Sequence, residues 1–122
     1  MNKEITMPPP VATFIRAVND HDADAFLSTF TKDAVVTDVG REFRGLAAIK
    51  EWSDREIFDV NVILDVVVVA ECDGHTVVTF KVDGTFDTTG LPDPLLLEHH
   101  FTLKGGKIAA FKSRLAGEEP GV

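Results

Sequence analysis

The spacing of the apolar residues changes near residue 55, and this change constrains the fold more than any other feature of the sequence. Before it, apolar residues recur at helical intervals. After it, β-branched and aromatic residues dominate four segments, at 57–70, 76–86, 95–103 and 107–115. Glycine-containing links at 72–75 and 104–107 are typical of hairpins, which make consecutive strands antiparallel neighbours. Helices followed by a long antiparallel sheet predict an α+β domain whose helices cover one face of the sheet.

Three helices are expected ahead of the sheet. The first follows the prolines at 8–10 and ends near Asp20, with an apolar face made by Val11, Phe14, Ile15 and Val18. The second has Asp22 as its N-cap and is broken by residues 31–33, and its apolar side is Phe26, Leu27 and Phe30. The third follows a turn and a short extended piece, and its inward face is Leu46, Ile49 and Trp52.

A carboxylate lies inside the apolar strand that precedes the third helix. Ala34, Val36 and Asp38 share one face of this strand because side chains alternate at a period of two, so an inward Val36 makes Asp38 inward as well. Burying a carboxylate costs free energy unless it is paired, hydrogen-bonded or protonated, and catalytic acids and bases are found at such positions. The alternative is that Asp38 merely ends the strand and caps the turn at 39–40.

Length and composition limit the class of protein. The 122 residues fit one domain, 1–122, with an adequate core, and we expect flexible ends at 1–7 and 117–122. The single cysteine, Cys72, and a polar N-terminus without a secretion signal predict a cytoplasmic protein. No apolar stretch reaches membrane-spanning length, and a net charge of −8 without a basic cluster disfavours nucleic acid. Without a metal-ligand or nucleotide-binding motif in the sequence, we expect no metal and no cofactor.

The order of these residues resembles the nuclear transport factor 2-like (NTF2-like) superfamily, and within it the SnoaL-like polyketide cyclases and the ketosteroid isomerases. The matching positions cover nearly the whole chain: Phe14, Asn19, Asp22, Phe30, Asp33, Ala34, Asp38, Arg44, Gly45, Ala48, Ile49, Trp52, His100, Phe101, Gly106, Lys107 and Ile108. The resemblance implies a cone-shaped barrel, in which three N-terminal helices and a curved, mainly antiparallel sheet enclose a deep pocket. It also implies a homodimer through the outer sheet face. Members of the superfamily include isomerases, dehydratases, epoxide hydrolases, cyclases and non-catalytic proteins, so fold alone does not give function.

Compared with ketosteroid isomerase, one polar position is kept and two differ. Asp38 falls where that family has its proton-shuttling carboxylate, in a similar valine-rich strand. Phe14 stands where the isomerase has a tyrosine, and His99 stands where it has a protonated aspartic acid. The resemblance therefore implies Asp38 as the base, whereas the two differences argue against steroid isomerisation itself.

The alternation along 95–103 decides whether His99 faces the same pocket as Asp38. If Leu97 and Phe101 face the core, His99 faces it too, because alternate residues share a face. The outward set of this segment is then Glu98 and His100. The segment 107–115 alternates in the same sense, and its inward set is Ala109, Phe111 and Ser113.

Two functions fit this arrangement. In the first, the protein is a cofactor-independent isomerase, cyclase or lyase, in which Asp38 removes a proton beside a carbonyl and a neutral His99 hydrogen-bonds the carbonyl oxygen. A small hydrophobic substrate would be bound by Phe14, Trp52, Phe80 and Phe111, unless these aromatic residues are plain core. In the second, Asp38 and His99 are a satisfied buried pair, and the protein is a non-catalytic ligand-binding or dimerisation module.

Overall fold

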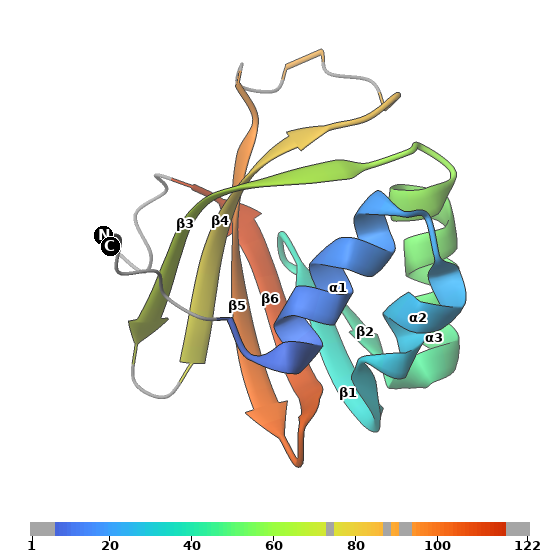
Figure 1. Cartoon of the computed structure of the whole chain (residues 1–122). Helices are drawn as coiled ribbons and strands as arrows, with labels where there is room; N and C mark the ends of the chain where they lie inside the picture. Colours follow the sequence, from blue (N-terminus) through green and yellow to red (C-terminus); the bar gives the residue numbers. More distant parts are fainter. Residues whose placement is uncertain (1–6, 73–74, 87–88, 91–93, 117–122) are drawn as a thin grey trace.

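A computed structural model describes residues 7–72, 75–86, 89–90 and 94–116, and three α-helices in it lie against one face of a curved six-stranded sheet (Figure 1). The helices are α1 (Pro9–Asn19), α2 (Ala23–Ser28) and α3 (Gly45–Ser53), and a π-helical turn, η1 (Asp54–Phe58), continues α3. The strands are β1 (Phe30–Asp38), β2 (Arg41–Arg44), β3 (Ile63–Cys72), β4 (His75–Asp83), β5 (Leu96–Lys104) and β6 (Lys107–Leu115). The predicted α+β class is confirmed. The ends predicted to be flexible, 1–7 and 117–122, lie outside the described residues except for Met7.

Helix α1 forms as predicted, and one polar residue at its end fixes it to the sheet. Prolines occupy its first positions, where a missing N–H breaks no helical hydrogen bond. Its buried face includes Val11, Phe14 and Val18. At its last residue, the Asn19 side chain donates to the Leu64 carbonyl (2.9 Å) and accepts from the Leu64 N–H (2.7 Å). This two-way bond holds the C-terminal end of α1 against β3.

Helix α2 begins where the sequence predicts and ends earlier. The Asp22 carboxylate accepts from the Ala25 N–H (3.1 Å), which is the expected N-cap. The assignment of Phe30 to this helix is wrong, because Phe30 pairs with Ile108 as the first residue of β1. Pairing with a distant strand therefore ends α2 after Ser28, before the residues expected to break it.

The six strands run in the order β2-β1-β6-β5-β4-β3. All neighbours are antiparallel except β1 and β6, which pair in parallel, so the sheet is mainly antiparallel as predicted. The hairpin predictions are also confirmed, since Cys72 pairs with His75 and Lys104 with Lys107. The parallel β1–β6 pair joins the first and last strands of the sheet in sequence order, and both lie inside the sheet rather than at its edges (Figure 1).

Three details of the predicted strands are wrong. Residues 57–62 do not belong to β3, because α3 continues into η1 and the strand begins at Ile63. Strand β4 ends at Asp83 and does not reach residue 86. Ala109 is not buried with Phe111 and Ser113, because a register shift opposite Thr102 and Leu103 moves Ile108 into the core instead.

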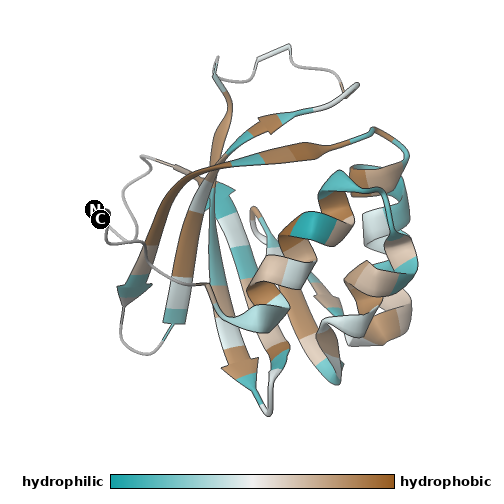
Figure 2. Ribbon diagram, viewed as in Figure 1, coloured by the Kyte–Doolittle hydropathy of each residue, from teal (hydrophilic) through white to brown (hydrophobic). Residues whose placement is uncertain are grey.

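The core lies between the helices and the inner face of the sheet. Its fully buried aromatic side chains come from both layers, and they are Phe14, Phe26, Phe80 and Phe101. Figure 2 shows apolar and polar residues alternating along several strands, and a long hydrophobic stretch along β3. Part of that stretch is exposed, at Val66, Val67 and Val68. In the described part of the chain, no helix is long and apolar enough to span a membrane.

Candidate active site

The inner face of the sheet and the helices enclose a cavity of about 440 Å³. This volume lies within the range of small-molecule sites, which is roughly 300–1,000 Å³. Most lining residues are apolar, among them Val18, Trp52, Ile57, Leu64, Val82 and Leu97. The polar lining residues are Asp38, Arg55, Glu56, His99 and Ser113. The cavity therefore suits a mainly apolar ligand that carries a few polar atoms.

The register of the sheet places three of these polar residues in one row. Asp38 on β1 pairs with Ser113 on β6, and Ser113 pairs with His99 on β5. Residues in one row across neighbouring strands point to the same face, and neighbouring strands lie about 4.8 Å apart. The backbones of Asp38 and His99 are therefore separated by about 10 Å, twice that spacing, with Ser113 between them.

Asp38 lies at the rim of the cavity, where its side chain is 17% exposed. One carboxylate oxygen, Oδ2, accepts from Trp52 Nε1 (3.1 Å) and from Arg41 Nη2 (2.7 Å). Within the described residues no hydrogen bond reaches the other oxygen, Oδ1. The first oxygen is thus held in place by two donors from α3 and β2, while the second is open to accept a proton.

Arg41 links Asp38 to a second carboxylate. Its guanidinium donates to both oxygens of Glu56, from Nη1 to Oε2 (2.8 Å) and from Nη2 to Oε1 (2.6 Å). These bonds lower the pKa of Glu56 and raise the pKa of Arg41. Asp38, Arg41 and Glu56 form an ion network that we call the rim network, and it joins β1, β2 and η1.

The turn between β1 and β2 also contributes to the rim. Asp38 pairs with Arg41, so the connection is the two-residue turn Val39–Gly40, with φ of +47° and +87°. Two positive φ angles define a type I′ turn, in which Asn-Gly is favoured and a β-branched residue is an outlier. Val39 nevertheless occupies the first position, lines the cavity and is 57% exposed.

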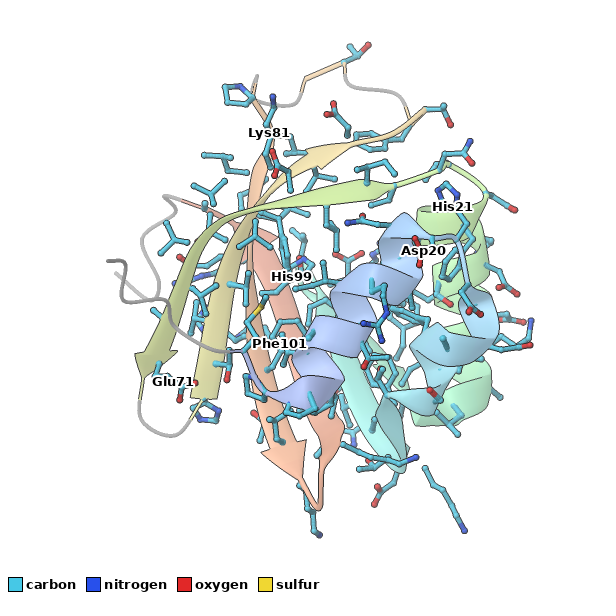
Figure 3. The ribbon with its side chains drawn as sticks, in the orientation of Figure 1. Asp20, His21, Glu71, Lys81, His99 and Phe101 are labelled. Atoms are coloured by element: carbon cyan, nitrogen blue, oxygen red, sulfur yellow. The ribbon has the colours of Figure 1, made fainter. Side chains whose placement is uncertain are left out.

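His99 lies at the opposite, buried end of the row. We call this end of the cavity, formed by His99 and Ser113, the floor. His99 is 6% exposed, and its ring packs against those of Phe80 (4.8 Å between centroids) and Phe111 (4.6 Å). Figure 3 shows His99 and Phe101 in the space between the sheet and α1. Burial lowers the pKa of His99 to about 3, with a smaller effect from the charge of His100. The imidazole is therefore neutral at neutral pH.

The floor contains two unpartnered polar atoms. Among the described residues, His99 Nδ1 and Ser113 Oγ are the buried side-chain atoms without a hydrogen-bond partner. Asp38 does not supply that partner, because its carboxylate bonds Trp52 and Arg41. The two predicted polar residues thus share the cavity without forming the satisfied buried pair that was the structural alternative.

The predicted aromatic residues occupy two layers. Phe14, Trp52 and Phe111 line the cavity, whereas Phe80 is fully buried, lies behind His99 and is not among the lining residues. Trp52 has two contacts at once, since its ring stacks on Phe43 (5.9 Å) while its N–H reaches Asp38. The aromatic positions therefore shape the cavity and also support both polar residues.

The sequence interpretation missed several residues of this site. Arg41 is three residues from Asp38 across a two-residue hairpin, a spacing that predicts a cross-strand pair. Glu56 lies just before the expected strand 57–70, and its position at the rim depends on the turn η1, which the sequence pattern does not predict. Ser113 was placed on the inward face, but its position between Asp38 and His99 depends on the parallel β1–β6 register, which no local pattern reveals.

The outward residues of β5 form a separate cluster on the far face of the sheet. Glu98 Oε1 accepts from Arg114 Nε (3.0 Å) and Nη2 (2.9 Å), and it lies 3.1 Å from His100 Nε2. These bonds lower the pKa of Glu98. A second cavity of about 360 Å³ lies beside this cluster. No group of three His, Cys, Asp or Glu side chains that could hold a metal occurs in the ranges that the structure describes.

Solved structures similar to this chain come from several bacteria. A Sinorhizobium meliloti protein, provisionally described as a polyketide cyclase, is 29% identical with a TM-score of 0.79, over 88% of this chain and 95% of that one. A Catenulispora acidiphila protein with a ketosteroid isomerase-like fold, solved with trimethylamine, is 19% identical with a TM-score of 0.73, over 89% and 86%. A Mycobacterium tuberculosis protein, solved with estradiol-17β-hemisuccinate, is 14% identical with a TM-score of 0.71, over 86% and 89%.

At the level of sequence, the chain matches one family model. No curated protein matches the chain at a significant level. The model of the SnoaL-like domain matches residues 11–111, which include most of α1, all of α2 and α3, and five of the six strands completely. Together with the cone-like arrangement of helices and curved sheet, this match shows that the chain belongs to the SnoaL-like domain family and has an NTF2-like, ketosteroid isomerase-like fold.

Proposed function

We propose that this protein binds a small apolar carbonyl compound and catalyses a cofactor-independent proton transfer on it. The observation that carries the proposal is the composition of the cavity. It is apolar, yet it has a carboxylate with one unbonded oxygen at the rim and a neutral imidazole on the floor of the same row. A base and a hydrogen-bond donor on opposite sides of a ligand are the two groups that enolisation requires.

The reaction follows from these positions. Asp38 Oδ1 takes a proton from the carbon beside the carbonyl, and the electron pair of that C–H bond moves toward the carbonyl oxygen. An N–H of His99 stabilises the negative charge that develops there. The protonated Asp38 then returns the proton to another carbon, so the substrate is isomerised with no net change in atoms or electrons. Trp52 and Arg41 hold Oδ2 and orient the carboxylate throughout.

Similar solved structures support a small, mainly apolar ligand as the substrate class. The Sinorhizobium meliloti protein is provisionally a polyketide cyclase, and the Mycobacterium tuberculosis protein was solved with a steroid ester. In the proposed complex, Phe14, Trp52 and Phe111 pack on the apolar body of the ligand, while Phe80 supports His99 from behind.

Hydrogen–deuterium exchange tests the proposal directly. Small ketones, including 2-tetralone and 3-cyclohexenone, are incubated with the protein in D2O, and loss of the proton signals beside the carbonyl is followed by NMR. We expect faster exchange than in buffer, and a loss of about a hundredfold or more in Asp38→Asn, the usual size of a general-base effect. Asp33→Asn is the matched control, because Asp33 is exposed on the same strand and bonds Thr31 rather than the cavity.

A specific observation favours a non-catalytic binding module as the second candidate. Phe14 lines the cavity without offering a donor, and the chain contains no tyrosine to replace it. A binding module would be stabilised by the ketones in a thermal melt without exchanging their protons. In that case Asp38→Asn would lower the melting temperature and change no rate, which would overturn the catalytic proposal.

We also propose that the protein is a cytoplasmic homodimer that associates through the outer face of the sheet. The partly buried Arg114 of the cluster with Glu98 and His100 supports the dimer, because arginine is enriched at protein–protein interfaces. Light scattering should give twice the mass of the chain, and Arg114→Glu should shift it to the monomer. A wild-type monomer would remove the proposal and leave the cavity chemistry unaffected.

A further inference from the structure

The unpartnered atoms on the floor belong to residues that face each other directly. His99 on β5 and Ser113 on β6 are register partners, and both side chains point to the inner face. The Cβ atoms of directly opposed residues lie about 4.5–5.5 Å apart, which places a serine hydroxyl within reach of an imidazole nitrogen. Each residue therefore has the other as its polar register partner across the β5–β6 pair.

Neither atom has a hydrogen-bond partner elsewhere among the described residues, and the other register partner of Ser113, Asp38, lies at the rim with its Oδ2 bonded to Trp52 and Arg41. His99 is 6% exposed and Ser113 is 3% exposed, and the two atoms themselves are shielded from solvent. Four phenylalanine rings surround the imidazole, at centroid distances of 4.6–6.2 Å, and they offer no acceptor or donor. Buried polar groups in proteins are nearly always hydrogen-bonded, so two adjacent exceptions point to a bond between them.

The direction of that bond follows from counting protons. If Ser113 Oγ–H donates to Nδ1, the hydroxyl proton and the bare ring nitrogen are both satisfied, and the remaining ring proton lies on Nε2. If Nδ1–H donated to Oγ instead, the hydroxyl proton would need a further acceptor, and the described residues show none bonded to it. A change of one staggered χ1 rotamer is enough to aim a serine hydroxyl at a neighbour.

We propose that Ser113 donates a hydrogen bond to His99 Nδ1 and thereby fixes the tautomer of His99 that carries its proton on Nε2. Ser113 is then a positioning residue, which acts on the ligand only through His99. The inference deepens the proposed function and rests on it for its catalytic consequence, because the Nε2–H would be the donor to the substrate oxygen. The tautomer itself does not depend on any substrate.

Nitrogen NMR of the full-length, 15N-labelled protein tests the tautomer without a ligand. At pH 7 we expect one His99 signal set, with a proton on Nε2 and a bare, hydrogen-bonded Nδ1. Ser113→Ala should convert it to a mixture of tautomers or to the Nδ1–H form, while Ser113→Thr, which keeps the hydroxyl, should retain the wild-type pattern. A His99 in the wild-type protein that carries its proton on Nδ1 would overturn the proposal, even if Ser113→Ala does not fold.

The chain supplies a matched control. His75 Nδ1 lies 3.0 Å from Thr102 Oγ1, which is a hydroxyl–imidazole pair between β4 and β5 on the outward face of the sheet. Thr102→Val should change the signals of His75 and leave His99 unchanged, whereas Ser113→Ala should do the reverse. Unchanged His99 signals in a folded Ser113→Ala variant would refute the proposed bond.

Activity separates this inference from the proposed function. In the ketone exchange assay, Ser113→Ala should lose about tenfold in rate with little change in KM. If the wild-type protein has the expected tautomer but exchanges no ketone, the proposed function fails and the assignment of Ser113 remains. If exchange depends on Asp38 but His99 carries its proton on Nδ1, the assignment of Ser113 fails and the proposed function remains.

Discussion

The polar groups at the rim and at the floor of the cavity differ in their exposure to solvent and in their partners. At the rim, Asp38 and Glu56 share the guanidinium of Arg41, and every charge in this network has a partner and some contact with solvent. On the floor, His99 and Ser113 are almost fully buried, and their atoms Nδ1 and Oγ have no charged partner among the described residues. The difference indicates that rim charges contribute little to stability, whereas the floor carries a cost that a fold alone would not require.

The largest expected effect is a loss of stability in acid that originates at the floor. The pKa of His99 is about 3 in the folded protein and about 6.5 in an unfolded chain, so below pH 6.5 only the unfolded state takes up this proton. The titration of His99 therefore has no effect on stability above pH 6.5, and it destabilises the fold as the pH falls toward 3. Urea melts should show the free energy of unfolding falling by up to about 1.4 kcal/mol per pH unit in this window.

Between pH 6.5 and 4.5, the pH dependence of stability reports on His99 at the floor and not on the partnered carboxylates. The partnered carboxylates Glu56 and Glu98 have pKa values lowered below 4.5, so their contributions are lost only in stronger acid. His99→Leu should remove most of the slope above pH 4.5. An unchanged slope in that variant would mean that His99 is not the group responsible.

Trp52→Phe should have the next largest effect, because Trp52 connects the rim to the core. The indole N–H donates to Asp38, and the ring is 4% exposed. Losing a hydrogen bond to a charged group should cost about 1.5–3 kcal/mol in unfolding free energy. The ketone exchange rate should also fall, since Oδ2 keeps only Arg41 as its donor. A stability loss with an unchanged rate would restrict the role of Trp52 to packing.

Val39→Asn should make the protein more stable and weaken its ligand binding. Asparagine tolerates the left-handed conformation of the turn, so we expect a gain of about 1 kcal/mol in thermal melts. The same change removes an apolar side chain from the rim, and the Kd for 2-tetralone should rise several-fold. His21→Asn is the control, because His21 also has a positive φ (+57°) but does not line the cavity. Equal binding by both variants would exclude Val39 as a ligand contact.

The smallest effect is expected at the exposed part of the rim network. Glu56→Gln removes a charge from a pair in which both side chains are at least one-third exposed, and such pairs contribute about 0–1 kcal/mol. Stability should change within that range and less in high salt. A loss above 2 kcal/mol would show that the rim is as costly to disturb as the floor, and would remove the contrast between them.

Much of this architecture follows from local patterns in the sequence. The apolar spacing around Phe14 predicts α1, and the period of two along β1 and β5 correctly places Asp38 and His99 on the inner face. These predictions hold because side-chain direction within one helix or strand is fixed by backbone geometry alone.

The relations between distant segments could not be predicted in this way. The row that joins Asp38 to His99 depends on Ser113 and on the parallel β1–β6 pair. This pair is formed by two strands that lie far apart in the sequence. The turn η1 continues a helix into residues whose composition favours a strand, and the resulting position of Glu56 depends on tertiary contacts. The Ala109 error has the same origin, because a bulge is a feature of pairing rather than of one strand.

The parallel β1–β6 junction also ties the site to the order in which the chain folds. More than half of the sequence separates the two strands, and closing so long a loop is slow compared with forming helices or hairpins. On the ribosome, β1 must wait for β6 to emerge, with its apolar face covered only by the early helices. Because Asp38 and Ser113 meet across this junction, we expect ketone exchange to be among the last properties that the refolding protein acquires.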